Sequence, residues 1–191
     1  HRAAPRTLPS LRHGTAIQEF SATHVREAAR SINDEPDLAA FAARYDWFVV
    51  GSDQVLNPLY RQVSPIDFLT FAQARQRVAY DASFGVPEIP APYRSRYAGY
   101  LRGIPHISVR EGRAAEIVAE LTGRDVPVVL DPTLLLTAED WSATIGERRA
   151  PNEDYLLTFF LSELTGSESA EIARHAAANG LAVVDPLDPS S

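Results

Sequence analysis

The 191-residue chain contains no cysteine, no methionine and no lysine. The absence of cysteine excludes disulfides, zinc–thiolate sites and a cysteine nucleophile. No run of about 18 apolar residues occurs, so no transmembrane helix is predicted. All 18 basic residues are arginines. Any side-chain cation in a binding site, histidine aside, therefore has to be an arginine.

Several motifs and charge patterns are also missing. Neither G-x-x-x-x-G-K-[ST] nor G-x-G-x-x-G occurs, which argues against a P-loop and a dinucleotide-binding turn. The five histidines do not stand at metal-ligand spacing, and no H-E-x-x-H is present, so no metal site is predicted. Acidic residues outnumber basic ones by 25 to 18. This balance argues against nucleic acid as a partner, because phosphate backbones require concentrated positive charge.

The two ends of the chain are unusual. The first residue is His1, and no basic-then-apolar leader follows it. The last residues are rich in proline and aspartate and come just after an apolar run. These features predict a fragment cut at both ends, whose own activity would be lost if half of the active site lies outside it.

What is present indicates an α/β fold. Apolar residues make up 45% of the chain and charged residues 23%, as is ordinary for globular proteins. Short apolar runs alternate with helical patterns, which predicts βαβ units and a mostly parallel, Rossmann-like sheet with flanking helices. The predicted strands are residues 47–50, 77–80, 104–109, 126–130, 155–161 and 181–184. The predicted helices are residues 15–31, 34–44, 92–101, 110–121, 137–145 and 167–178. Thr137 is the predicted N-cap of the fifth helix, and residues 179–180 (NG) are predicted to end the last one.

The pattern also predicts a division into domains. Residues 1–146 are expected to form a first Rossmann-like domain that is incomplete at its start. Residues 147–154 are charged and contain Pro151, which is typical of a linker. Residues 155–191 would then begin a second α/β domain.

The first strand has a specific expectation attached to it. Residues 47–50 form a continuous apolar run that stops at Gly51, which is typical of a strand buried on both faces. Ligands of parallel sheets gather at the carboxyl ends of the strands. Residues 51–54 (GSDQ) therefore could bind a hydroxylated or phosphorylated ligand. The alternative is an ordinary tight turn. The spacing of these residues alone favours the tight turn over a ligand site.

The second strand ends in residues 81–85 (DASFG). A serine at a sharp turn could be a nucleophile, but a hydrolase elbow reads G-x-S-x-G, and this segment does not. We therefore favour a Ser83 that bonds to the local backbone. Asp81 follows an apolar strand, where an unpaired carboxylate is costly. It is expected to be paired with an arginine, exposed, or functional.

The third strand ends at Arg110. An arginine beside a helix N-terminus suits a phosphate or carboxylate. A salt bridge to Glu111, Asp131 or another nearby carboxylate explains it equally well. His106, the one histidine within a strand-like run, is a candidate for a buried core histidine.

The order of four motifs resembles the polysaccharide pyruvyl transferase family. The similarity covers roughly residues 40–145, and four motifs in the expected order are more specific than any one of them. The matching segments are residues 45–58 (YDWFVVGSDQVLNP), residues 68–72 with 77–85 (FLTFA and RVAYDASFG), residues 107–111 (ISVRE), and residues 129–136 with Trp141 (VLDPTLLL and W).

This resemblance implies a glycosyltransferase-B-like arrangement of two α/β domains facing a cleft. It implies a cytoplasmic bacterial enzyme of exopolysaccharide biosynthesis, with no cofactor. The donor would be phosphoenolpyruvate and the acceptor a sugar of a cell-surface polysaccharide or of its lipid-linked precursor, which implies peripheral contact with a membrane. The substrate-binding residues carried over are Arg110, Gly51, Ser52, Asp53, Gln54, Ser83, Phe84 and Gly85.

The chain departs from the family pattern at several points. Leu56 stands where tryptophan is usual, and Asp81 stands where a small residue is usual. The Gly-rich opening and the later Arg/His motif of the family are absent, so no catalytic residue is assigned. Two alternatives stay open: a nucleotide-sugar glycosyltransferase of the same fold, and a non-catalytic α/β binding domain.

Overall fold

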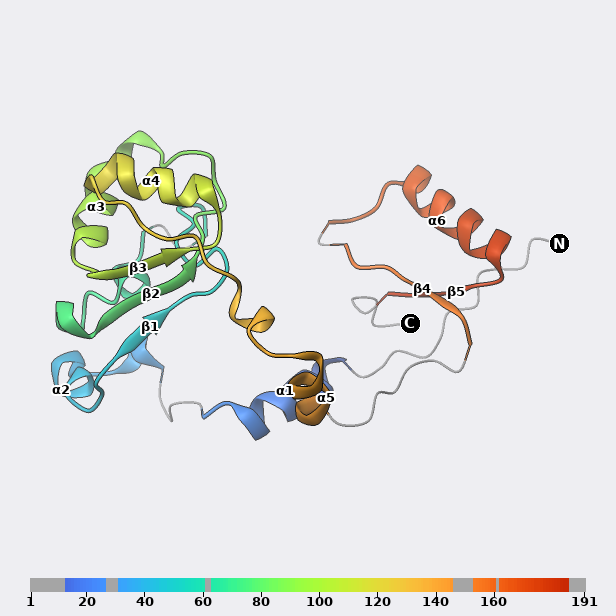
Figure 1. Cartoon of the computed structure of the whole chain (residues 1–191), viewed down its shortest axis with the longest axis horizontal. Helices are drawn as coiled ribbons and strands as arrows, with labels where there is room; N and C mark the ends of the chain where they lie inside the picture. Colours follow the sequence, from blue (N-terminus) through green and yellow to red (C-terminus); the bar gives the residue numbers. More distant parts are fainter. Residues whose placement is uncertain (1–12, 27–30, 61–62, 146–152, 161, 186–191) are drawn as a thin grey trace. The chain divides into compact units, whose positions relative to one another are not determined.

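A computed structural model describes residues 13–26, 31–60, 63–145, 153–160 and 162–185. The chain divides into two compact units, one of residues 29–141 and one of residues 1–28 with 142–191. The observed class is α/β, with parallel strands and flanking helices in the first of these units. Figure 1 shows the ribbon of both units, and each is described here by itself.

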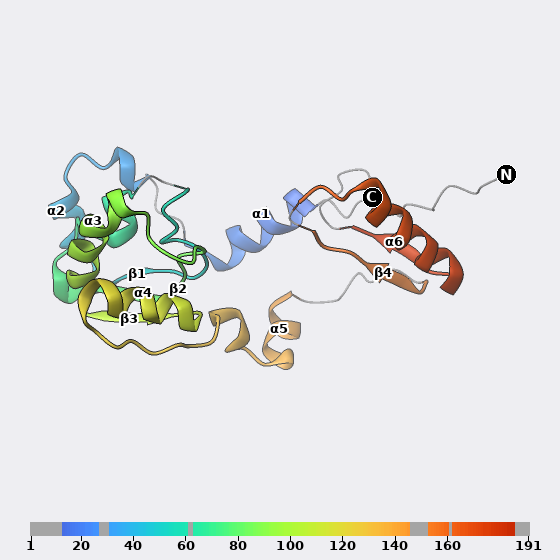
Figure 2. The ribbon, with the colours of Figure 1, turned by 90° about the horizontal axis from the view of Figure 1, so that it is seen from above.

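The larger unit contains a three-stranded parallel sheet in the order β1-β2-β3. Its strands are β1 (Phe48–Val50), β2 (Arg77–Ala82) and β3 (His106–Val109). The connections hold η2 (Pro65–Phe68), η3 (Ala74–Gln76), α3 (Ala91–Arg102) and α4 (Gly112–Thr122). Figure 2 shows α3 and α4 together against the sheet. The core of this unit lies between the sheet and these two helices.

The hydrophobic pattern explains this packing. On α4, Ala114, Ile117, Val118 and Leu121 recur at helical spacing, and all four are buried. On the sheet, Val50, Ala79 and Ile107 are buried on the face that joins this core. A parallel α/β sheet built in this way brings the carboxyl ends of all its strands to one edge.

The burial of β1 differs from the expectation from the sequence. Val49 is 63% exposed and Trp47 is 56% exposed, so β1 is not buried on both faces. β1 pairs with β2 alone among the described strands and therefore stands at the edge of the sheet. The apolar run reflects the aromatic contacts of Phe48 with Phe41 and Phe71 rather than burial on both faces.

Several elements are shorter than predicted, among them β3, which begins at His106 rather than at residue 104. The expected strand at residues 126–130 contributes a single parallel bridge, between Val109 and Val128. The expected helix at residues 34–44 is shortened to α2 (Leu38–Ala42), because Asp37 caps it by accepting a hydrogen bond from the Ala40 N–H, and η1 (Ile32–Asp34) precedes it. His106 is exposed at the start of β3, against the expectation of a core histidine. The described turn that holds η4 (Pro132–Leu134) follows the bridge.

The second unit contains a two-stranded parallel sheet of β4 (Tyr155–Leu157) and β5 (Ala182–Val184). The strands are joined through α6 (Gly166–Asn179). A capping box of Thr165 and Glu168 begins α6, and Gly180 ends it in the left-handed conformation, as residues 179–180 predict. The described part of the chain also contains α1 (His13–His24) and α5 (Ala138–Ile145), the latter capped by Thr137 as predicted.

Candidate functional site

The candidate site lies at the carboxyl edge of the three-stranded sheet. Arg110 follows β3 directly, and Asp53 follows β1 after a two-residue turn. Asp81 lies near the end of β2. The Val129 N–H donates to the Val109 carbonyl at 2.9 Å, which draws the following Asp131 to the same edge. Four segments that are distant in sequence therefore converge at one place.

The guanidinium of Arg110 joins these segments. Its Nε donates to Asp81 Oδ2 at 3.1 Å, its Nη1 to Asp53 Oδ1 at 3.1 Å, and its Nη2 to Asp131 Oδ2 at 2.8 Å. We call these four residues the Arg110 cluster. Glu111 is not among the partners. The salt-bridge expectation for Arg110 is confirmed, with Asp131 as one of the predicted partners.

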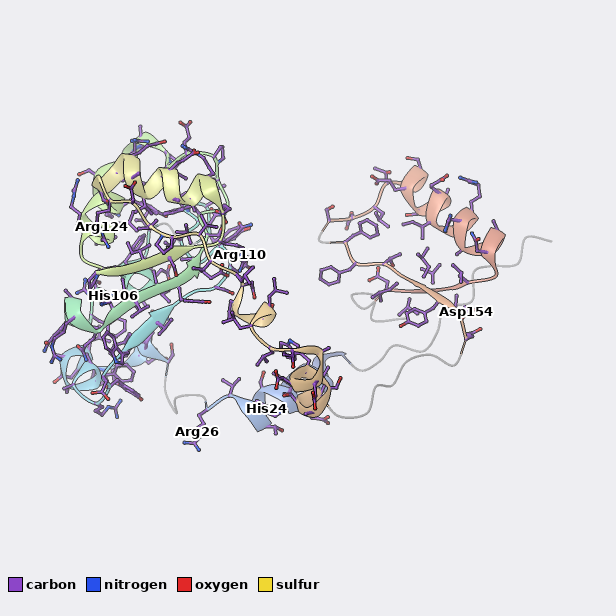
Figure 3. The ribbon with its side chains drawn as sticks, viewed as in Figure 1. His24, Arg26, His106, Arg110, Arg124 and Asp154 are labelled. Carbon is purple, nitrogen blue, oxygen red and sulfur yellow. The ribbon has the colours of Figure 1, made fainter. Side chains whose placement is uncertain are left out.

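The Arg110 side chain keeps part of its surface free. It is 32% exposed, and Figure 3 shows it at one end of the sheet, away from His106. A guanidinium has five N–H groups, and three of them are used within the cluster. Desolvation opposes its charge. The hydrogen bond to Asp81 and the charges of Asp81, Asp131 and Asp53 outweigh this effect and raise the pKa of Arg110.

Asp131 is held by two sets of contacts. Its Oδ1 accepts hydrogen bonds from the Thr133 backbone N–H at 2.9 Å and from the Thr133 hydroxyl at 2.6 Å. The Ser52 hydroxyl reaches Asp131 Oδ2 at 3.5 Å. The Thr133 bonds, followed by the charge of Arg110, lower the pKa of Asp131 below its ordinary value. Asp131 is therefore ionised at neutral pH.

Asp81 owes its position to an irregularity in β2. Ala79 pairs with Ile107 and Ala82 with Val109, so three steps along β2 match two steps along β3. The extra residue is a β-bulge, which re-aims the local side chains. Asp81 has a φ of 52°, in the left-handed region, and its side chain has no exposed surface. Of the three alternatives for Asp81, the structure shows pairing with an arginine and excludes exposure.

Ser83 belongs to a second pair of polar groups beside the cluster. Its hydroxyl donates to Glu111 Oε1 at 2.9 Å and accepts from the Gly85 N–H at 3.1 Å. The bond from Gly85 agrees with the predicted local backbone contact, and the residue is buried. Glu111 is the N-cap residue of α4, yet its side chain makes no capping hydrogen bond. The first turn of α4 therefore keeps backbone donors next to Arg110.

The two glycines of the predicted site are required by close packing. Gly51 has a φ of 130°, and a Cβ there would lie 1.9 Å from the Tyr80 carbonyl oxygen. Gly85 has a φ of 61°, and a Cβ there would lie 2.1 Å from Gln54 Oε1. That same Gln54 oxygen accepts from Asn57 Nδ2 at 2.8 Å. Both glycines hold the strand-end loops close together.

Phe84 has a different place from the other predicted residues. Its side chain is fully buried, and its ring centroid lies 6.0 Å from that of Tyr97 in the core. Leu56 is also in the core, and its carbonyl accepts from the buried Tyr97 hydroxyl at 2.8 Å. Both residues pack in the core beneath the loops, and the Phe84 ring has no surface exposed to a ligand.

The sequence named Asp131 and Glu111 as salt-bridge partners of Arg110 and did not place them among the substrate-binding residues. Asp131 carried a usable signal, because it follows an apolar run as Asp53 and Arg110 do. The β-bulge at Asp81 carried no such signal, because the order of polar and apolar residues in 77–82 does not mark an extra residue. Within the described residues, no group of three or more histidine, aspartate or glutamate side chains could hold a metal ion. No described helix is long and apolar enough to cross a membrane.

Comparison with known proteins identifies the family. The family model described as polysaccharide pyruvyl transferase matches residues 12–186. This chain belongs to the polysaccharide pyruvyl transferase family. The matched range includes every residue of the Arg110 cluster and the loop residues 51–54 and 83–85. No curated protein and no solved structure matches the chain.

Proposed function

We propose that this protein transfers a pyruvyl group from phosphoenolpyruvate to two hydroxyl groups of a saccharide, which is a sugar of a cell-surface polysaccharide or of its precursor. The observation that carries this proposal is the family match over residues 12–186, which contains the whole strand-end site. The described geometry supports it with a charged, partly exposed arginine at the edge where parallel sheets bind ligands.

The reaction fixes what the site has to do. A proton is added to the methylene carbon of the donor, which becomes a methyl group. One sugar hydroxyl adds to the neighbouring carbon, the bond from that carbon to the phosphate oxygen breaks, and a second hydroxyl adds to complete the ketal. Of the two hydroxyl protons, one balances the proton added to the methylene carbon and the other leaves with inorganic phosphate. The site must therefore bind an anion and hold two hydroxyl groups.

Arg110 is the proposed contact for the phosphate or carboxylate of the donor. Two of its five N–H groups have no acceptor among the described residues. The N-terminus of α4 starts two residues later, at Gly112, and lacks a side-chain cap. A guanidinium and a helix N-terminus together suit a small multivalent anion.

The loops around Arg110 are the proposed contacts for hydroxyl groups. The Asp53 side chain is 77% exposed and can accept hydrogen bonds from a sugar. The remaining proposed substrate contacts are Gly51, Ser52, Gln54, Ser83 and Gly85. No general acid is assigned.

We further propose the two-domain, glycosyltransferase-B-like arrangement, with a first domain at residues 1–146, a linker at 147–154 and a second domain from residue 155. The β4–α6–β5 unit supports the second domain, because two parallel strands joined through a helix are the unit of an α/β sheet. Transfer to a lipid-linked precursor would occur in the cytoplasm at the membrane surface.

A coupled assay tests the proposed reaction. The protein is incubated with phosphoenolpyruvate and a panel of saccharides, and phosphate release is measured together with the mass of each saccharide. We expect phosphate release that depends on one acceptor, which gains the mass of a pyruvyl ketal. Arg110→Ala should abolish both signals, and the exposed Arg96→Ala on α3 should leave them unchanged. Consumption of a nucleotide sugar in place of phosphoenolpyruvate would contradict the proposal and favour a glycosyltransferase.

A further inference from the structure

Asp81 combines features that fold stability does not explain. Its side chain is completely buried, and one oxygen, Oδ2, bonds to Arg110 Nε. The other oxygen, Oδ1, has no hydrogen-bond partner in the part of the chain that the structure describes. A buried carboxylate held by one ion pair contributes little net stability, because the cost of desolvation offsets the Coulomb attraction.

The charge of Asp81 acts directly on the proposed anion contact. Asp53, Asp81 and Asp131 surround one arginine, so the Arg110 cluster has a formal charge of -2, from three aspartates and one arginine. An anion that approaches the free N–H groups of Arg110 is attracted by one charge and repelled by three. The repulsion between the Asp81 carboxylate and the anion is strong because Asp81 is shielded from water.

Asp81 also fixes which part of Arg110 is available. The Nε group points to Asp81, so the guanidinium can meet a ligand only through its terminal nitrogens. The bulge in β2 and the left-handed backbone at Asp81 hold the carboxylate in this position. The side chain is therefore a fixed partner of Arg110 rather than one of several mobile surface charges.

We propose that Asp81 is a positioning residue that acts through Arg110: it fixes the guanidinium by its Nε group and weakens the binding of anions to it. This inference rests on the proposed function, in which phosphoenolpyruvate enters the site and inorganic phosphate has to leave it. A cluster of net negative charge keeps both anions weakly bound, so the product phosphate is released readily. Removal of the Asp81 charge should therefore strengthen anion binding, whereas removal of a merely structural residue can only weaken it.

The test is a calorimetric titration of inorganic phosphate and, separately, of phosphoenolpyruvate. Asp81→Asn keeps an oxygen acceptor for Arg110 Nε and tolerates the left-handed backbone, so it removes only the charge. We expect this variant to bind both anions about tenfold more tightly than the wild-type protein at low ionic strength. The gain should shrink as salt is added. Asp125→Asn, which removes one exposed charge after α4, is the matched control and should change neither affinity.

The outcomes separate this inference from the proposed function. Unchanged or weaker phosphate binding in a folded Asp81→Asn protein would overturn the inference, while phosphoenolpyruvate binding that still depends on Arg110 would leave the proposed function intact. If Asp81→Asn does not fold, Asp81→Gly, which suits the φ of 52°, decides the question. Phosphate affinity that rises at least threefold in Asp81→Gly supports the inference, and an unchanged affinity overturns it.

Discussion

The two ends of the three-stranded sheet use arginine in opposite ways. At the amino end, Arg77 donates to the carbonyls of Thr70, Ala72 and Gly103. At the carboxyl end, Arg110 donates to carboxylates alone. Burial lowers the pKa of Arg77, whereas the surrounding carboxylates raise that of Arg110 despite partial desolvation.

Arg124 repeats the pattern of Arg77. Its Nη1 donates to the Ile104 carbonyl at 2.8 Å and its Nη2 to the Pro105 carbonyl at 2.7 Å, just before β3. Figure 3 shows Arg124 and Arg110 at different ends of this unit. A guanidinium that satisfies backbone carbonyls ties loops together, whereas one surrounded by carboxylates concentrates charge at an exposed edge. The comparison separates arginines that support the fold from the one proposed for function.

The largest expected effect belongs to Arg110. Arg110→Ala should lower kcat/KM for phosphoenolpyruvate by about 10³-fold, because the site then lacks its fixed cation. Arg110→Lys should restore little, since one ammonium cannot reach three carboxylates from three loops. Steady-state kinetics measure this effect. A loss below tenfold in Arg110→Ala would remove Arg110 from the donor site.

The opposite end should respond in stability and not in binding. Arg77→Ala should lower the free energy of unfolding by about 3 kcal/mol, because three backbone carbonyls lose a charged donor. Arg124→Ala should cost about 2 kcal/mol for the same reason. Urea unfolding measures both values. The donor affinity of each folded variant should equal that of the wild-type protein, and a change above threefold would break the distinction between the two ends.

Gly51 tests the packing beneath the site. Gly51→Ala places a Cβ 1.9 Å from the Tyr80 carbonyl oxygen, at a φ of 130° that disfavours any side chain. The loop after β1 must shift, so we expect a loss of about 2–3 kcal/mol in unfolding free energy and weaker donor binding together. Gly112→Ala is the control, because a Cβ there would meet nothing within 4 Å. Equal stability of the two variants would contradict the described loop geometry.

Asp131 should give the smallest effect, visible in acid. Its pKa is lowered in the folded state, so its ionised form stabilises the protein above the unfolded-state pKa, near the ordinary value of 3.8. This stabilisation is lost as the pH falls through the lower folded-state pKa. Asp131→Asn should therefore lose stability at pH 7 and flatten the fall in stability below pH 4, as measured by urea unfolding at each pH.

Asp140 provides the control for that experiment. Its pKa is lowered in the same way, by hydrogen bonds from Thr137, but it lies in the first turn of α5, bonded to the N-cap residue Thr137, and takes no part in the Arg110 cluster. Asp140→Asn should flatten the fall in stability below pH 4 without altering anion binding. If the fall in unfolding free energy below pH 4 is the same in Asp131→Asn and in the wild-type protein, the contacts described for Asp131 are contradicted.

Local patterns predicted much of this fold. The apolar run of residues 77–80 predicted β2, the residues 179–180 predicted the end of α6, and Thr137 predicted the start of α5, because each depends on neighbouring residues alone. The exposure of Val49 could not be predicted, since a buried and an edge strand share the same apolar run. The prediction of a strand at residues 126–130 was wrong, because β pairing there is limited to one bridge, between Val128 and Val109.

The site was predictable in its parts and not in its contacts. The strand-end loops followed from the alternation of strands with helices, whereas the choice of Arg110 as the anion contact came from the resemblance to the family. Which carboxylates meet Arg110 depends on the bulge in β2 and on the path that brings Asp131 to the same edge. Both are consequences of tertiary packing, which no local pattern in residues 77–82 or 126–131 records.

Phosphorus NMR of phosphoenolpyruvate tests the central claim most directly. The donor is titrated with wild-type protein, with Arg110→Ala and with Arg124→Ala, the last under conditions where it stays folded. We predict that the phosphorus resonance shifts or broadens with the wild-type and Arg124→Ala proteins and stays that of free donor with Arg110→Ala. A resonance that responds equally to all three proteins would contradict the assignment of the donor to the Arg110 cluster.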